Sequence, residues 1–210
     1  MDTFLVVFPE SSFVPVVLGF FGLGTGYLVW GPQELLGLPA RDASVDRSTG
    51  VWGIFMPGLC QLITGVYLFV GMSWFQVFDD KVLFMAALAF SAYGIHWFAL
   101  GWNRFQQSDP RPNGGMSIAF TIISVLGMVV FFGAGGWPVG VLFAGLTGVY
   151  ITEFFASVPL GGSGSATAGK TMTFGEKGIG FFHIMTGLWL MYLTFSTTLN
   201  IAADYNLPGG

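Results

Sequence analysis

The stretch FSAYGIHWFALG, residues 90–101, places an ionisable histidine inside an apolar run. His96 is the only acidic or basic side chain in this run, and Tyr93 stands three residues before it. In a helix the spacing i, i+3 and i+4 puts Tyr93, His96 and Trp97 on one face. Phenol and imidazole groups form hydrogen bonds, and imidazole can also carry a proton. This face predicts either a polar pathway or a histidine bonded to a neighbouring helix, and both interpretations stay open here.

Three further strongly polar side chains fall in apolar segments: Gln61, Glu153 and His183. Polar groups are costly in hydrocarbon, so those inside membrane segments are informative. We expect Gln61 and His96 to line a polar pathway. Glu153, like His96, is a candidate proton site, although its place near the end of TGVYITEFFASVP also suits contact with headgroups or water. His183 is expected near the interface, and the other ten acidic residues are expected in loops or tails.

The composition indicates the solvent in which these side chains lie. Of the 210 residues, 53% are hydrophobic and only 9% are charged. A typical soluble domain carries about 25% charged residues, so most of this surface cannot face water. The sequence predicts a multi-pass integral protein of the cell membrane, in contact with the lipid bilayer.

Six apolar stretches reach the length of about 17–25 residues that a helix needs to cross hydrocarbon. They are continuous, whereas the strands of a membrane barrel would alternate over about ten residues. The expected fold is therefore an all-α membrane protein. A tail (1–12) precedes a six-helix transmembrane domain (13–200), and a second tail (201–210) follows it. The expected spans are 13–30, 51–72, 82–101, 116–133, 138–156 and 178–199.

Several function classes lack their usual residues in this chain. Cys60 is the single cysteine, which excludes an intrachain disulfide and any CxxC metal or redox motif. The net charge of −4 and the lack of a basic cluster argue against nucleic acid as a partner. No phosphate-binding glycine loop, base–nucleophile set or metal-ligand set is visible. We expect no enzymatic activity, no cofactor and no metal site.

The distribution of lysine and arginine predicts an orientation. The side of the membrane that carries the termini holds only Lys81. The loops after the first, third and fifth expected spans hold Arg41, Arg47, Arg104, Arg111, Lys170 and Lys177. Because cytoplasmic loops are enriched in Lys and Arg, this count places those loops in the cytoplasm and both termini outside.

An ordered series of motifs runs along the chain. IFMPGLCQLITG (54–65) fits the pattern IFxGGxxQxxAG, and AFSAYGIHW (89–97) fits AFxSYGxFW. MVVFFG (128–133), LFAGLTGVY (142–150) and the carboxyl end GLWLMYLTFSTTLNIAADYNLPGG follow in matching order. In these motifs the chain resembles the acetate uptake transporters of the succinate–acetate permease type. The resemblance covers nearly all six spans.

This resemblance implies a homo-hexamer in which each six-helix protomer has its own narrow pore. The family's constriction of Phe, Tyr and Leu falls on Phe21, Tyr93 and Leu146. His96 then lies one turn from the constriction, at a position where the family usually has Phe. The family also implies cytoplasmic termini, opposite to the charge count, so the orientation stays open. The residues expected along the substrate pathway are Thr25, Gln61, His96, Trp97 and Asn200.

Two features depart from the family pattern. The opening motif NPAPLGLxGFGxTT is kept only in part in SSFVPVVLGFFGLGTG, and position 68 is Leu where the family usually has Glu. The expected function is passive or proton-coupled transport of acetate and similar short-chain carboxylates, through a transporter or a channel. One alternative, which the departures favour, is a non-transporting membrane subunit of a larger complex. The other is a pore for small neutral solutes such as urea or amides.

Overall fold

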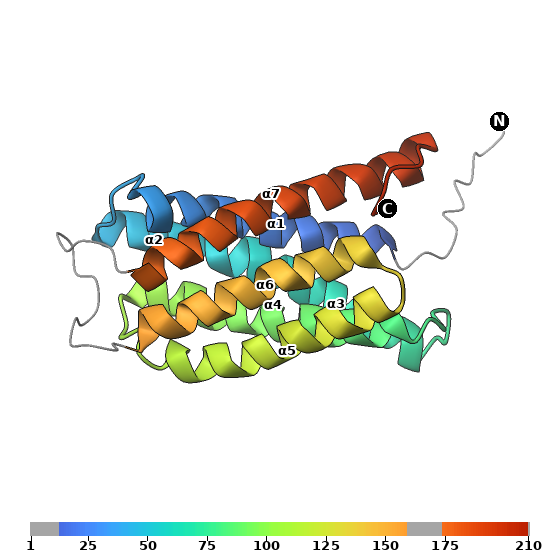
Figure 1. Ribbon diagram of the computed structural model, residues 1–210, viewed down its shortest axis with the longest axis horizontal. Helices are drawn as coiled ribbons and strands as arrows, with labels where there is room; N and C mark the ends of the chain where they lie inside the picture. Colours follow the sequence, from blue (N-terminus) through green and yellow to red (C-terminus); the bar gives the residue numbers. More distant parts are fainter. Residues whose placement is uncertain (1–12, 159–173, 210) are drawn as a thin grey trace, which may run out of the picture.

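The protein is a bundle of long helices in the computed structural model, which describes residues 13–158 and 174–209 (Figure 1). These residues contain no β-strand. In chain order the elements are α1 (Phe13–Leu36), α2 (Ala43–Gly53), the π-helical segment η1 (Ile54–Leu59), α3 (Cys60–Ser73), α4 (Val82–Gln106), α5 (Asn113–Gly133), α6 (Trp137–Ser157) and α7 (Phe174–Ala203).

Five helices are long and apolar enough to cross a membrane. The first is the continuous run of α2, η1 and α3, which is 31 residues long, and the others are α4, α5, α6 and α7. The chain is thus a multi-pass membrane protein built from helices. The remaining expected span, the first in chain order, lies in α1, which is 24 residues long and packs along α7 (Figure 1).

Each expected span lies within a helix, and several helices run past the expected limits. α1 continues to Leu36, and α4 continues to Gln106. Six charged residues that were expected in loops are helical, so that expectation is wrong for Glu34, Asp46, Arg47, Arg104, Glu176 and Lys177. Hydropathy detects only the apolar part of a helix. Gln, Glu and Arg have good helix propensity, so a helix can continue through them beyond the hydrocarbon.

The glycine-rich face of α1 packs closely on η1. A Cβ atom at Gly22 would lie 2.4 Å from Cys60 Cβ and 2.6 Å from the carbonyl oxygen of Met56. A Cβ atom at Gly26 would lie 2.6 Å from Pro57 Cγ. Small residues allow this approach, as they commonly do between membrane helices.

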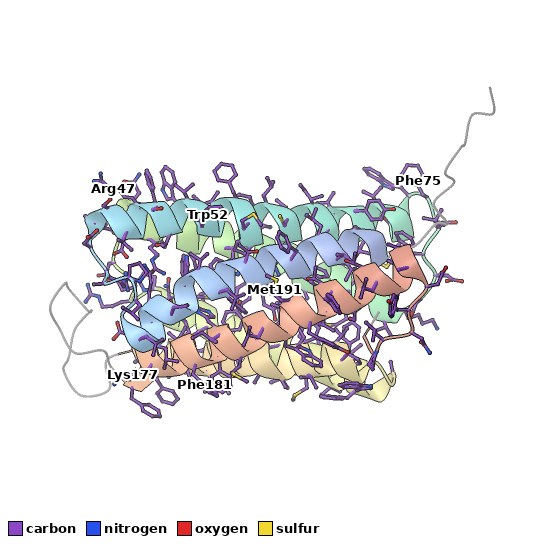
Figure 2. All side chains as sticks on the ribbon, turned by 90° about the horizontal axis from the view of Figure 1, so that it is seen from above. Arg47, Trp52, Phe75, Lys177, Phe181 and Met191 are labelled. Atoms are coloured by element: carbon purple, nitrogen blue, oxygen red, sulfur yellow. The ribbon has the colours of Figure 1, made fainter. Side chains whose placement is uncertain are left out.

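The bundle has two distinguishable ends. At the first, termed the basic end, α1, α4 and α6 finish and α2, α5 and α7 begin, and Figure 2 shows Arg47 and Lys177 there. At the other, termed the tail end, α1 begins and α7 finishes, and Figure 2 shows Phe75 there. A polar path across the membrane would have to join these two ends.

Candidate functional site

A cavity of about 530 Å³ enters the bundle from the tail end. Its mouth is formed by Asp80, by the turn between α5 and α6, and by Gly209. Its walls are largely apolar and come from α1, α4, α5 and α6, with Val16, Phe20, Leu83, Phe90, Phe131, Leu142 and Phe143 among them.

The cavity reaches the middle of the bundle, where Gln61, Tyr93 and Leu146 line it. These three residues, termed the cavity floor, are each at most 2% exposed. Ser124 Oγ donates to the carbonyl oxygen of Phe120 at 2.6 Å, so Tyr93 Oη is the donor in its 2.9 Å bond to Ser124 Oγ. Gln61 Oε1 has no hydrogen-bond partner among the described residues. The floor thus combines a fixed phenol, an unpaired amide oxygen and an aliphatic side chain.

Beyond the floor, further buried polar atoms without partners continue toward the basic end. In the described part of the chain, Trp97 Nε1 and Thr186 Oγ1 have no hydrogen bond, and Tyr27 Oη has none of ordinary geometry, although it interacts with the Tyr150 hydroxyl. The Tyr27 ring lies 5.8 Å from that of Trp97 and stacks on His183 at 4.3 Å. Leaving such a group unpaired costs about 1–3 kcal/mol, and native structures contain few of them. We term Tyr27, Trp97 and Thr186 the polar axis.

A cluster of charged residues closes the polar axis at the basic end. His183 Nδ1 lies 2.6 Å from Glu34 Oε2, which joins α7 to α1. Arg104 of α4 lies 3.8 Å from Glu34 Oε1 and 3.5 Å from Asp46 Oδ1 of α2. Arg104 also donates to Gln33 and stands 4.1 Å above the Trp30 ring. Four helices therefore meet at one charged network, termed here the charge cluster (Glu34, Asp46, Arg104 and His183).

The charge cluster is the part of the site that sequence reasoning missed. Glu34 and Arg104 were assigned to loops because hydropathy falls after the apolar segments. For Arg104 a signal was present, since the segment from Gly101 to Arg104 contains no turn motif, whereas Gly31–Pro32 before Glu34 is a typical turn dipeptide. In the structure α1 nevertheless continues through Pro32.

His96 lies in a different place from the cavity. It is 6% exposed and lines a second pocket, of about 430 Å³, with residues of α4 and the start of α5. Its ring lies 4.5 Å from Phe120, and neither ring nitrogen has a partner in residues 13–158 and 174–209. Exposed Ile95 and Ala99 border this pocket, so it opens to the side of the bundle. His96 shares the buried face of α4 with Tyr93 and Trp97 but does not line the cavity.

The expected constriction is only partly assembled. Tyr93 and Leu146 line the cavity, whereas Phe21 is 44% exposed on the outer face of α1. Phe20 occupies the inner position instead. The inward face of α1 follows the helical repeat through Val16, Phe20, Leu23, Tyr27 and Trp30, all buried. Phe21 lies about 100° around the helix from that face.

Three other expected site residues make local contacts. Thr25 Oγ1 donates to the carbonyl oxygen of Phe21 at 2.8 Å, within its own helix. Asn200 bonds both the backbone nitrogen and the carbonyl oxygen of Leu207, each at 2.8 Å, which holds the tail against α7. Glu153 accepts from Asn113 at 3.3 Å and from Ser157 at 3.2 Å. None of the three lines the cavity.

No group of three His, Cys, Asp or Glu side chains that could hold a metal ion occurs in the described ranges. Comparison with known proteins gives no family assignment: no protein-family model, curated protein or solved structure matches the chain.

Proposed function

We propose that this protein is a six-span membrane transporter or channel, passive or proton-coupled, for acetate and similar short-chain carboxylates. The proposal is carried by one observation. A largely apolar cavity ends at mid-bundle on an amide and a phenol, and unpartnered polar atoms continue from there toward the opposite end. The order of the sequence motifs gives independent support.

The chemistry of the floor suits a small carboxylate. Its methyl group prefers the apolar walls, and its charge needs hydrogen-bond donors in place of water. A 180° rotation of the Gln61 side-chain amide exchanges its oxygen and nitrogen, and the NH2 group can then donate a hydrogen bond to the carboxylate. Among the described residues, Trp97 Nε1 is the next unpartnered donor along the axis, and the Tyr27 ring lies 5.8 Å from the Trp97 ring. Among the described residues no lysine or arginine lines the cavity, so the anion is not held too tightly to leave.

In this proposal α1 is the sixth span and the functional unit is a homo-hexamer with a pore in each protomer. At 1.5 Å per residue, a helix of this length reaches about 36 Å, which exceeds the hydrocarbon thickness of about 30 Å. The extensive packing of α1 on α7 and its inward aromatic face are consistent with a place inside the membrane domain.

The test is uptake of labelled acetate into liposomes that hold the purified protein, with and without a pH gradient. Protein-free liposomes correct for acetic acid that crosses the lipid unaided. We expect protein-dependent uptake that unlabelled short acids compete away. Absence of uptake for every short acid at every pH would overturn the proposal.

Two outcomes would favour the alternatives. Urea flux that matches or exceeds acetate flux, with no dependence on pH, would indicate a pore for neutral solutes. Co-purification of a different protein in fixed stoichiometry, together with no transport, would indicate a subunit of a larger complex.

A further inference from the structure

The Glu34–His183 contact requires a hydrogen between its two atoms. At 2.6 Å, a carboxylate oxygen and a bare ring nitrogen would oppose lone pair to lone pair. The pair therefore holds at least one proton, on His183 Nδ1 or on the carboxyl group. The side chain of His183 is 6% exposed and that of Glu34 is 13% exposed, so this proton is largely shielded from water.

The pair has two charge states that differ by one proton. In the state with fewer protons, Glu34 is a carboxylate beside a neutral His183 whose hydrogen is on Nδ1, and the pair carries a charge of −1. A second proton, taken from hydronium, produces an imidazolium beside a carboxylate, with net charge zero. The step forms an N–H bond at His183 Nε2 and breaks an O–H bond of hydronium, which leaves as water.

The charged residues around the Glu34–His183 pair nearly balance one another, so the second proton on the pair determines the net charge at this end of the bundle. Arg104 of α4 and Arg41 face Asp46 of α2, with Arg41 Nε 2.9 Å from Asp46 Oδ1. Glu153 of α6 interacts electrostatically with both Glu34 and His183, and Glu176 of α7 interacts with Arg41. The two cations, Arg41 and Arg104, are thus opposed by Asp46, Glu153 and the more distant Glu176. Of the other titratable groups, His96 of α4 interacts electrostatically with His183, and Tyr27 of α1 with Glu34. No excess of positive charge therefore hides the protonation state of the Glu34–His183 pair.

We infer that Glu34 and His183 form a proton-binding gate at the basic end, so that a carboxylate passes this end only when the pair is doubly protonated. The inference rests on the proposed function, since it assigns the second end of the same pathway. In the −1 state the pair repels an anion that moves along the polar axis, and Glu34 attracts Arg104. In the neutral state the repulsion is lost and Arg104 is freer to meet the anion. The stack of Tyr27 on His183 links the gate to the axis.

The decisive variant is Glu34→Gln, which keeps the size of the side chain and a hydrogen-bonding group beside His183 but removes the charge. Acetate uptake is measured with the same pH inside and outside, after subtraction of protein-free liposomes. We expect wild-type uptake to rise about fivefold or more between about pH 8 and pH 5.5, and the rise to be lost in Glu34→Gln. His183→Gln should lose it as well, and serves if the first variant does not fold.

Asp109→Asn is the matched control, because Asp109 is an acidic residue of an exposed ion pair at the same end. The hydrogen bonds from Arg111 hold the pKa of Asp109 at about 2. Because this pKa is lowered, the Asp109–Arg111 contact is complete above the ordinary aspartate pKa and is lost only as the pH falls through about 2. The Asp109 carboxylate therefore stays ionised throughout the assay, and Asp109→Asn should keep the wild-type pH profile.

A second readout does not depend on transport. The chain has only two histidines, so ring-labelled protein gives two imidazole signals, and His96→Phe assigns them. Acetate should change the protonation of His183 in wild type and not in Glu34→Gln. The gate would be overturned if Glu34→Gln kept the wild-type pH profile, or if acetate did not change the His183 signal. In either case, acetate uptake by the wild-type protein would still support the proposed function. Absence of uptake by wild type would instead overturn the proposed function.

Discussion

Gln61 and Leu146 line the same cavity floor, and the first contributes a polar surface to it while the second contributes an apolar one. Gln61 brings a buried amide oxygen without a partner in the described residues, and Leu146 contributes only carbon atoms. An unpaired polar group lowers stability, so its presence is best explained by a ligand or water that pairs with it during function. Substitutions at these two residues should therefore separate stability from transport in different ways.

Gln61→Leu should raise or preserve stability while it impairs uptake. The change replaces the amide by an aliphatic group of similar size, which removes an unsatisfied polar atom whose cost is about 1–3 kcal/mol. The melting temperature in detergent should not fall, whereas acetate uptake should. Equal uptake in variant and wild type would show that the amide is no part of the pathway.

Leu146→Ala should widen the floor and admit larger acids such as lactate or succinate, at a stability cost of about 2–5 kcal/mol. Leu190→Ala is the matched control, because Leu190 is fully buried but does not line the cavity. Uptake selectivity and melting temperature are measured for both. If both variants lose similar stability and neither changes selectivity, Leu146 is a packing residue.

His96→Phe tests whether this histidine takes part in the pathway. The residue borders the lateral pocket and not the cavity, and both its ring nitrogens lack partners in the described structure. Phe has comparable bulk and would pack beside Phe120. We expect wild-type uptake, an unchanged pH profile and an equal or higher melting temperature. A flattened pH profile would return His96 to the role of proton site that its sequence position first indicated.

At the scale of elements, the contact between α1 and η1 sets the position of the inward face of α1. Gly22 and Gly26 meet η1 at distances that leave no room for a side chain. The π-helical segment contains Pro57, which has no backbone N–H to donate, and it separates α2 from α3 in one continuous helix. This contact positions Leu23 over the cavity and Tyr27 on the polar axis.

Gly22→Leu and Gly26→Leu should each destabilise the protein or disturb its assembly, because the new side chain would displace η1 from α1. Gly115→Leu is a suitable control, since nothing lies within 4 Å of the position of its Cβ. Melting temperature and elution volume in detergent are the measurements. Wild-type values for both α1 variants would contradict the close packing seen here.

At the scale of the whole molecule, the outer surface is rich in large apolar side chains. Trp52 and Phe181 project outward in Figure 2 and are each 49% exposed, and Phe21 is similarly exposed. In a bilayer such residues can contact lipid or another copy of the chain. The proposed hexamer would cover part of this surface.

Native mass spectrometry of the protein in detergent should give six times the 22.6 kDa mass of the chain. Because Phe21 lies on the outer face of α1, Phe21→Ala tests whether this face is an interface between copies. We expect the variant to shift the population toward smaller assemblies. A strictly monomeric wild type would contradict the hexamer, and an unchanged hexamer in the variant would place the interface on another face.

Much of the fold was determined by the sequence alone. The low content of charged residues and the continuous apolar runs were sufficient to predict membrane helices, because only a helix satisfies its own backbone in hydrocarbon. The inward face of α1 was not predicted, because this helix is apolar on nearly every side, and the expected inward residue Phe21 is 44% exposed. The resemblance to a transporter family directed attention to Tyr93, Leu146 and Gln61, which meet at the cavity floor.

Only the tertiary structure decided which polar residues meet. Glu34, Asp46, Arg104 and His183 come from four helices far apart in the chain, and no local pattern links them. Likewise, His96 and Tyr93 share a helix face and both pack against the rings of Phe120 and Tyr150, yet only Tyr93 borders the cavity. Helical periodicity fixes the direction of a side chain from its own axis. What that side chain touches depends on how the other helices pack around it.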